Sequence, residues 1–156
     1  MTMDRNPQQA TGDVVDRDKA AAIRAVCACA NLRRATRIVT RRYDEAMRAT
    51  GLRATQMSIL NEIACMGDAP VSELATRLAM DASTLTRNLT PLERDGVITA
   101  LKTQGGRRRR VRLTQRGAEI LEAAWPLWRE VQDAFEAQLG SESWRAMREG
   151  FTRLDQ

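Results

Sequence analysis

The stretch DASTLTRNLTPLERDG, residues 81–96, decides the fold. Asp81 is a residue type that caps helix N-termini, and Gly96 is the type that most often follows a helix end. The stretch therefore predicts a helix from Ala82 to Asp95. Three leucines recur at i, i+4 and i+7, the spacing of one inward-packing helix face: Leu85, Leu89 and Leu92. The polar residues between them are left on the outer faces.

A shorter helix is expected directly upstream. Pro70 opens the segment and Ser72 is suited to cap the helix. Its inner face is apolar: Leu74, Ala75 and Leu78. A tight connection at residues 79–83 joins it to the next helix, and two short helices joined so closely are typical of a helix-turn-helix. Another amphipathic helix is predicted before them, from Ala54 to Met66.

A β-hairpin is expected downstream. Residues 97–102 are rich in β-branched side chains, Gly105 and Gly106 signal a turn, and residues 109–113 alternate apolar and basic side chains. A helix-turn-helix followed by a hairpin with a basic tip is a winged helix-turn-helix. This lobe is assigned to residues 51–114.

Long helices are predicted on both sides of the lobe. Residues 18–50 contain no Pro or Gly and predict a single helix. Residues 115–156 predict a long helix, kinked by Pro126, and a final helix capped by Ser141. Residues 1–17 predict a disordered N-terminal arm. The fold class is mostly α with a small β-hairpin.

Composition narrows the function. The formal net charge is +5, and the segment 101–116 holds seven basic residues and no acidic one. So dense a cluster is expected to face an anion, and a solvated basic loop is the alternative. The chain has no histidine, the commonest general base and metal ligand, so we expect no cofactor and no metal site. Without a secretion signal or a long apolar stretch, a cytoplasmic protein with reduced thiols is expected.

An ordered set of motifs resembles the MarR (multiple antibiotic resistance regulator) family. Residues 81–87, with Leu92-Glu93 and 96–98 after them, look like the family's recognition helix and first wing strand. Residues 111–117 match its "L-T-x-x-G" signature, and Gly51-Leu52 with Gln56 matches the start of its second helix. The resemblance covers residues 31–139.

The resemblance implies a homodimeric regulator, usually a repressor, that binds a pseudo-palindromic operator in double-stranded DNA. The N- and C-terminal helices, residues 18–50 and 115–156, would form the dimerisation region. Aromatic side chains gather in the last two helices: Trp125, Trp128, Phe135, Trp144 and Phe151. The alternative is that they fill a monomeric core.

Three positions depart from the family pattern. The Asp usual at the wing tip is replaced by Gly105, two residues before the Arg that enters the minor groove, here Arg107. Pro91 lies deep in the recognition helix, where it is expected to kink the helix or tighten its last turn. Arg53 replaces a Thr cap, which leaves the start of the second helix less well specified.

Two sets of side chains are expected to contact DNA. Arg can bind guanine bidentately, Asn can bind adenine, and Thr or Ser can reach phosphate or a thymine methyl group. The alternatives are an ordinary polar helix face and non-specific phosphate contacts by the wing. The predicted contacts are Ser83, Thr84, Thr86, Arg87, Asn88 and Thr90 on the helix, and Arg107, Arg108 and Arg109 on the wing.

The regulator is expected to respond to a small molecule or to thiol modification. Cys27 and Cys29 form a possible thiol sensor, and small buried hydrophobes are the alternative. On a continuous helix such side chains point about 200° apart, which favours pairing with Cys65 or with another subunit. Relatives bind aromatic carboxylates or phenols, and four residues are suited to line such a site here: Arg33, Arg37, Tyr43 and Met57.

Two other classes of function remain as alternatives. A non-specific architectural DNA-binding protein would bind any duplex of equal length with one affinity. A thiol-dependent enzyme would use Cys27 or Cys29, but the sequence offers no His, no nucleotide-binding loop and no paired base. The chain is therefore not expected to be an enzyme.

Overall fold

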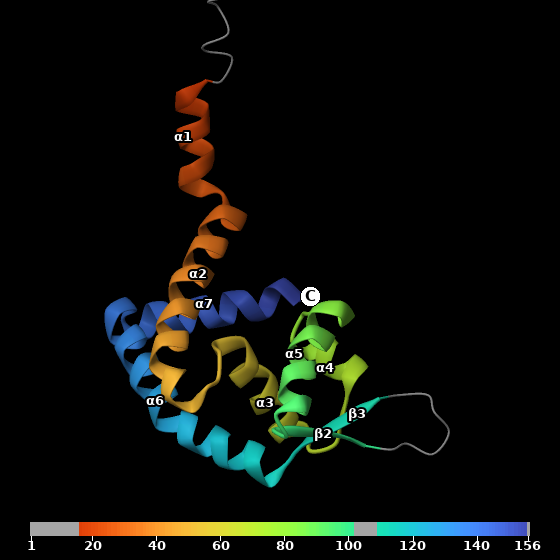
Figure 1. Ribbon diagram of the computed structural model, residues 1–156. Coiled ribbons are helices and arrows are strands. Elements are labelled where there is room, and N and C mark those ends of the chain that lie inside the picture. The colour runs from red at the N-terminus through yellow and green to blue at the C-terminus, as the bar shows by residue number, and fades with distance from the viewer. Residues whose placement is uncertain (1–15, 102–108, 156) are drawn as a thin grey trace, which may run out of the picture. The chain divides into compact units, whose positions relative to one another are not determined.

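The computed structural model describes residues 16–101 and 109–155 (Figure 1). Almost all of the predicted N-terminal arm and the predicted tip of the wing, Gly105 to Arg108, lie outside the described residues. The chain divides into two compact units, residues 1–39 and 40–156, and helix α2 continues from one into the other. Among the described residues, no helix has the length and apolar character needed to cross a membrane.

The first unit corrects the single helix predicted for residues 18–50. Helix α1 (Arg17–Val26) ends at Cys27, whose backbone is extended (φ −65°, ψ 110°), and helix α2 (Ala28–Ala46) begins immediately after it. The side chain of Asn31 supplies the physical reason for the break. Its amide donates to the carbonyl oxygens of Cys27, Ala25 and Arg24 at 3.0, 3.3 and 3.4 Å. These carbonyls at the end of α1 thereby gain a partner.

The second unit contains the remaining elements. A 3-10 turn, η1 (Met47–Thr50), ends at Gly51, whose φ of 74° suits glycine. The further elements are α3 (Ala54–Met66), β1 (Ala69–Pro70), α4 (Val71–Arg77), α5 (Ala82–Arg94), β2 (Ile98–Leu101), β3 (Arg110–Leu113), α6 (Gln115–Leu139), α7 (Ser141–Thr152) and the 3-10 turn η2 (Arg153–Asp155). Helices α5 and α6 each continue through their proline.

The sheet has one more strand than the sequence predicts. The expected hairpin is present, with Ile98 opposite Leu113 and Leu101 opposite Arg110. The additional strand β1 pairs antiparallel with the other side of β3, Ala69 opposite Val111, so the strand order is β1-β3-β2. A two-residue strand that contains a proline has almost no local signal, and only its pairing with β3 defines it.

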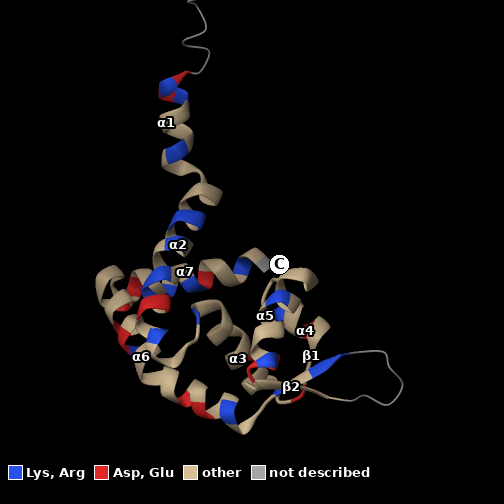
Figure 2. Ribbon diagram, viewed as in Figure 1, with Lys and Arg blue, Asp and Glu red and all other residues tan. Residues whose placement is uncertain are grey.

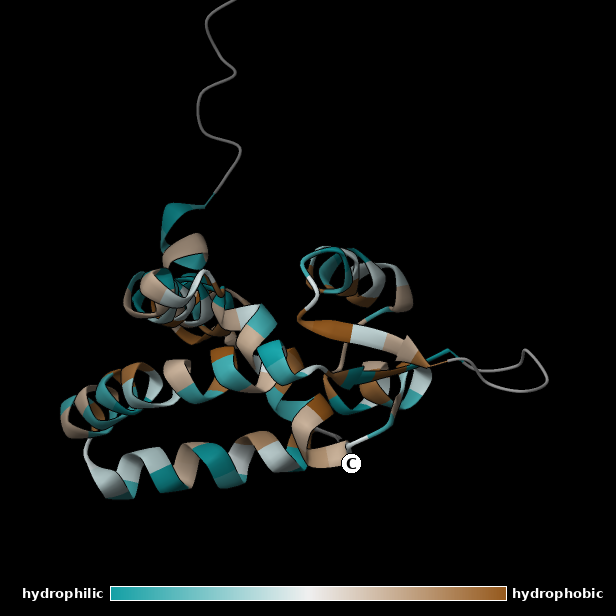
Figure 3. Cartoon of the chain, turned by 60° about the horizontal axis from the view of Figure 1, so that its bottom comes forward, coloured by the Kyte–Doolittle hydropathy of each residue, from teal (hydrophilic) through white to brown (hydrophobic). Residues whose placement is uncertain are grey.

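A continuous core joins α3, α4, α5 and the sheet. Figure 3 shows hydrophilic and hydrophobic residues mixed along the helices. The three leucines predicted for the inner face of α5 are at most 2% exposed. The largest side chains of this core that are below 2% exposure are Met47, Ile59, Leu60, Ile63, Leu74, Leu85, Leu89, Ile98 and Val111.

Several helix caps differ from the sequence prediction. Pro70 rather than Ser72 precedes α4, and Gly140 rather than Ser141 precedes α7, so each serine lies inside its helix. The start of α3 is held by a side chain from α2: Asp44 Oδ1 accepts from the Ala54 amide at 2.7 Å. Gln56 Oε1 accepts from the backbone of Arg53 at 3.0 Å. The missing Thr cap is thereby replaced.

The junction between the wing and α6 gives the "L-T-x-x-G" motif a physical meaning. The Thr114 hydroxyl lies 2.7 and 3.1 Å from the carbonyl oxygens of Gly96 and Val97, to which it can donate, and it accepts from the Gly117 amide at 3.1 Å. A Cβ at Gly117 would lie 2.1 Å from the Val97 oxygen. Glycine is therefore required where α6 passes this close to the start of β2.

Candidate nucleic-acid interface

Helix α5 presents the polar face predicted from the sequence. Asp81 caps the helix by accepting from the Thr84 amide at 2.8 Å, and the buried leucines fix which side turns inward. Ser83, Thr86, Arg87 and Thr90 are exposed, and Thr84 and Asn88 are half-buried. One helix therefore carries the six predicted contact residues, and none of them belongs to the buried core.

Three of these side chains donate to backbone carbonyls of their own helix. Thr86 Oγ1 donates to the Ala82 carbonyl at 2.7 Å, and Thr90 Oγ1 donates to the Thr86 carbonyl at 2.9 Å. Asn88 Nδ2 donates to the Thr84 carbonyl at 2.8 Å. The two threonine hydroxyl protons are thus engaged, and their oxygen lone pairs and methyl groups remain available outward.

The base of the wing is anchored by its arginines. Arg109 is exposed and forms an ion pair with Glu93, and the Arg110 guanidinium donates to the carbonyl oxygen of Asp68. Arg112 lies 4.0 Å from the Asp68 carboxylate. Figure 2 shows basic residues on α5 and at the start of β3. Of these three arginines the sequence predicts a DNA contact only for Arg109, and it does not predict the acidic and carbonyl partners. Arg107 and Arg108 lie outside the described residues.

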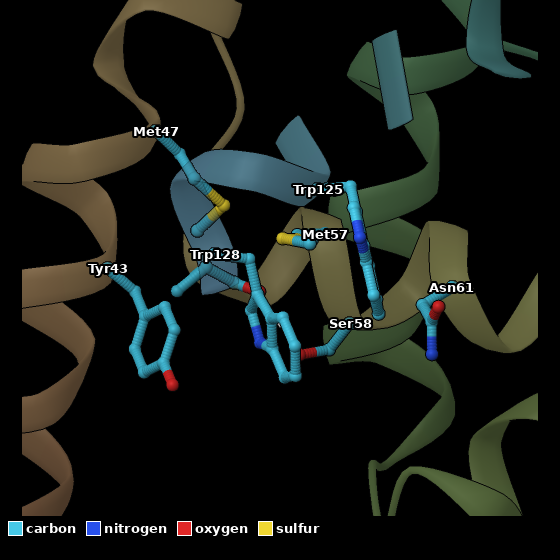
Figure 4. Close-up of a pocket in the computed structure, with 8 residues that line it drawn as sticks. Tyr43, Met47, Met57, Ser58, Asn61, Trp125 and Trp128 are labelled. Carbon is cyan, nitrogen blue, oxygen red and sulfur yellow. Dashed lines mark hydrogen bonds between the residues drawn. The ribbon is translucent and has the colours of Figure 1, made fainter. Parts of the chain in front are cut away.

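A cavity of about 360 Å³ lies between the end of α2, α3 and α6. Its lining residues are Tyr43, Met47, Ala54, Met57, Ser58, Asn61, Trp125 and Trp128. Figure 4 draws Trp128 between Tyr43 and Trp125, and the two tryptophan rings stack with centroids 5.0 Å apart. Tyr43 Oη donates to Gln132 at 2.9 Å, and burial raises the pKa of Tyr43.

The cavity brings together two of the four residues predicted for an effector site, Tyr43 and Met57. Arg33 and Arg37 are exposed side chains of the other compact unit. The sequence prediction missed Ser58, Asn61 and the two tryptophans. The sequence analysis assigns the tryptophans to a dimer interface or to a monomeric core, but their i, i+3 spacing also places both rings on one side of α6.

The cysteine pair lies at the break between α1 and α2. Cys27 is half-buried with extended backbone, whereas Cys29 and Cys65 are exposed, and all three are free thiols. The angle of about 200° expected between the Cys27 and Cys29 side chains assumes a continuous helix, and it does not apply because α1 ends before Cys27. In the single chain, the alternative of small buried hydrophobes does not fit Cys29, which is exposed.

Comparison with known proteins agrees with this architecture. The sequence profile of the MarR family matches residues 52–109. The transcriptional regulator MosR of M. tuberculosis, solved in complex with DNA, is 39% identical with a TM-score of 0.76, over 83% of this chain and 93% of that one. A probable transcriptional regulator of Pseudomonas aeruginosa is 27% identical with a TM-score of 0.75, over 83% and 98%.

A more distant structure shares the fold. The organohalide-sensing regulator RdhR, in its 2,4-dichlorophenol-bound form, is 16% identical with a TM-score of 0.73, over 96% of this chain and 87% of that one. No curated protein matches the chain by sequence.

Proposed function

Because the chain belongs to the MarR family of DNA-binding transcription regulators, we propose that it acts as a homodimeric repressor of a pseudo-palindromic operator. The observation that carries this proposal is the outer face of α5. It presents Arg87 and five short polar side chains, while the leucines on the opposite side of the helix are buried. Such a face suits a helix lying in a major groove. The wing would contact the neighbouring minor groove. A regulator of this kind acts on the genome, so we expect it in the cytoplasm.

The terminal helices supply the surface for dimerisation. In the first unit, Ile23 is 59% and Val26 is 83% exposed. In the second unit, α7 and η2 expose Met147, Phe151 and Leu154. Apolar side chains gathered on helices in this way mark an interaction surface. A dimer would also hold two α5 helices about 34 Å apart, the spacing of successive major grooves. We therefore assign residues 18–50 and 115–156 to dimerisation and residues 51–114 to DNA binding.

The cavity between α2, α3 and α6 is proposed as the effector site. Among the described residues, its lining is largely aromatic, with an amide and two hydroxyls and with no charged side chain. A neutral aromatic molecule with a hydroxyl, such as a phenol, fits this lining better than a carboxylate, because no cation lines the cavity to pair with the carboxylate. RdhR is named as a sensor of organohalides and was solved with a chlorinated phenol. An effector that binds the non-DNA-binding conformation more tightly would release the operator.

Thiol modification at Cys27 and Cys29 is a second candidate for the signal. Cys29 is exposed, and the pair occupies the helix break, where the backbone is not held in one continuous ladder. Oxidation that abolishes operator binding in the wild type, but not in a Cys27→Ser, Cys29→Ser variant, would support this candidate.

The function is tested by fluorescence anisotropy on the duplex directly upstream of the protein's own gene and on a scrambled duplex, at two salt concentrations. Salt-sensitive binding that prefers the native duplex by about 10³-fold or more would support a specific regulator. Equal binding to both duplexes would favour an architectural protein. The Arg87→Ala variant should lose about 1–3 kcal/mol of specific binding and relax base preference. Unchanged affinity and preference would contradict the placement of α5.

A further inference from the structure

The carboxylate of Asp81 accepts three hydrogen bonds at the start of α5. Ser83 Oγ donates to Oδ1 at 2.5 Å and the Thr84 amide donates to Oδ1 at 2.8 Å, while Thr84 Oγ1 donates to Oδ2 at 2.7 Å. Hydrogen bonds to the charged form hold the pKa of the Asp81 carboxyl well below its usual value. The carboxylate is therefore ionised at neutral pH and acts as an acceptor for both hydroxyls.

The hydroxyl of Thr84 links Asp81 to Arg87. A hydroxyl has one proton to donate and two lone pairs that accept. The Thr84 proton goes to Asp81, which leaves its oxygen to accept, and Arg87 Nη2 donates to that oxygen at 3.1 Å. Thr84 and Arg87 are three residues apart and so are neighbours on one helix face. The exposed guanidinium of Arg87 thereby has a defined contact with Thr84, whose side chain is half-buried.

The direction of these bonds determines what the helix offers to DNA. Because Asp81 takes the hydroxyl protons of Ser83 and Thr84, these two side chains present lone pairs outward. Arg87 is then the strong hydrogen-bond donor of this face. Its single bond to Thr84 leaves other N–H groups of the guanidinium, which carries five, for an outside acceptor such as O6 and N7 of guanine.

We propose that Asp81 is a positioning residue for DNA reading, which presets the direction of the Arg87 guanidinium through Thr84 before DNA binds. Fixing a long, rotamer-rich side chain costs binding free energy, and a side chain ordered in the free protein reduces that cost. The gain in binding free energy is restricted to the base pair that Arg87 contacts. This inference rests on the proposed placement of α5 in a major groove.

Two substitutions separate this role from helix capping. Asn caps helices about as well as Asp, so Asp81→Asn keeps the acceptor for the Thr84 amide. Its side-chain nitrogen, however, donates where the carboxylate oxygen accepts, and at least one hydroxyl must turn away. Thr84→Val removes the hydroxyl at nearly the same shape, and Thr84→Ser restores it. Thr76→Val on α4 is the matched control, because Thr76 donates only to its own helix, at 3.2 Å to the Ser72 carbonyl.

The probe is a duplex selected by the wild-type protein from a randomised pool. Each base pair of this duplex is then replaced in turn, and binding is compared between the wild type and the Arg87→Ala variant. The position at which only the wild type prefers the original base pair is the position that Arg87 reads. Dissociation constants are then measured by anisotropy for the selected duplex and for the duplex with that pair replaced. Their ratio is the discrimination at the Arg87 position, and the melting temperature and the salt dependence of binding are recorded for every variant.

We expect Asp81→Asn and Thr84→Val to lower this ratio roughly 3- to 10-fold, the value of ordering one long side chain. Thr84→Ser and Thr76→Val should keep the ratio. The salt dependence of the Thr84 variants should stay unchanged, because the Thr84 proton is donated to Asp81 and so is not offered to phosphate. In an Arg87→Ala background, Thr84→Val should have no further effect on the ratio. The melting temperature of Asp81→Asn should fall only moderately at neutral pH, because Asn still caps α5 and only the additional stabilisation of the carboxylate is lost.

The proposal is overturned if Asp81→Asn and Thr84→Val keep the ratio, or if they weaken binding to both duplexes equally. It is also overturned if Thr84→Val lowers the ratio as much without Arg87 as with it. A different result would refute the placement of α5 as well: an Arg87→Ala variant that keeps every base preference of the wild type. The two failures are therefore distinguishable.

Discussion

Arg109, the residue directly before strand β3, forms an ion pair with Glu93, near the C-terminal end of helix α5. The pair connects the base of the wing to the helix proposed to read DNA. It also means that one arginine of the basic segment is neutralised in the free protein. A count of basic residues therefore overstates the charge that the wing can offer to phosphates.

Replacing Glu93 by Gln should release Arg109 for the DNA backbone. The pair is partly exposed, so unfolding free energy should fall by less than about 1 kcal/mol. Affinity for any duplex should rise, and the slope of log K against log salt should steepen by about 0.9 for one added phosphate contact. Anisotropy titrations over a salt series measure this slope. Glu130→Gln, an equal charge change at an exposed position on α6, should leave the slope nearly unchanged, and an equal rise there would refute the interpretation.

Replacing Gly117 by Ala should destabilise the fold. The added Cβ would lie 2.1 Å from the Val97 oxygen and 3.1 Å from its carbonyl carbon, both backbone atoms that have little room to move. Overpacking of this kind costs about 1–3 kcal/mol, which urea unfolding resolves. Gly150→Ala is the matched control: it lies within α7 with no atom within 4 Å of the added Cβ, and it should stabilise by about 0.4–1 kcal/mol. Equal effects at both sites would contradict the close approach at Gly117.

The contribution of Asp81 to stability should depend on pH. Its pKa is lowered in the folded protein by the bonds from Ser83 and Thr84. A lowered folded pKa gives stability that is present above the unfolded value of about 3.9 and is lost as pH falls below it. The advantage of the wild type over Asp81→Asn in urea unfolding should therefore shrink between about pH 5 and pH 3. An advantage that stays constant across this range would show that the carboxylate is not specially stabilised.

Calorimetric titration should rank a neutral phenol above benzoate for binding to the cavity. The reason is the uncharged lining, in which Asn61 and Ser58 offer hydrogen bonds and the tryptophans offer aromatic faces. Asn61→Ala should weaken phenol binding by about 1 kcal/mol, the usual value of one hydrogen bond. Stronger binding of benzoate, lost in an Arg37→Ala variant, would instead favour a carboxylate site that includes Arg37, one of the four residues predicted from the sequence.

The sequence predicts well those elements whose ends carry their own signals. Helix α3 begins at Ala54 and ends at Met66 as predicted, and α5 is correct to one residue, because a cap, a leucine row and a glycine all agree. The break at Cys27 was missed because it depends on the side chain of Asn31, four residues further on. Strand β1 was missed because only β3, about forty residues away in the chain, defines it.

The candidate site shows the same division. The outward polar face of α5 follows from helical periodicity alone: four of its six residues are exposed in the structure, and Thr84 and Asn88 are half-buried. The contacts that anchor the base of the wing cannot be predicted in this way. The contact between Glu93 and Arg109, and that between Asp68 and Arg110, join residues that are distant in sequence. The effector cavity likewise needs three helices to meet, and spacing along one helix indicates only that both tryptophans share a side.

The stacked tryptophans give the protein an optical property of its own. Two of its three tryptophans, Trp125 and Trp128, form part of the cavity wall, and the third, Trp144, packs edge-on against Phe135. Much of the intrinsic emission therefore originates beside the space where an effector would sit. A molecule entering there would quench or shift that emission, so the unlabelled protein would report on its own occupancy.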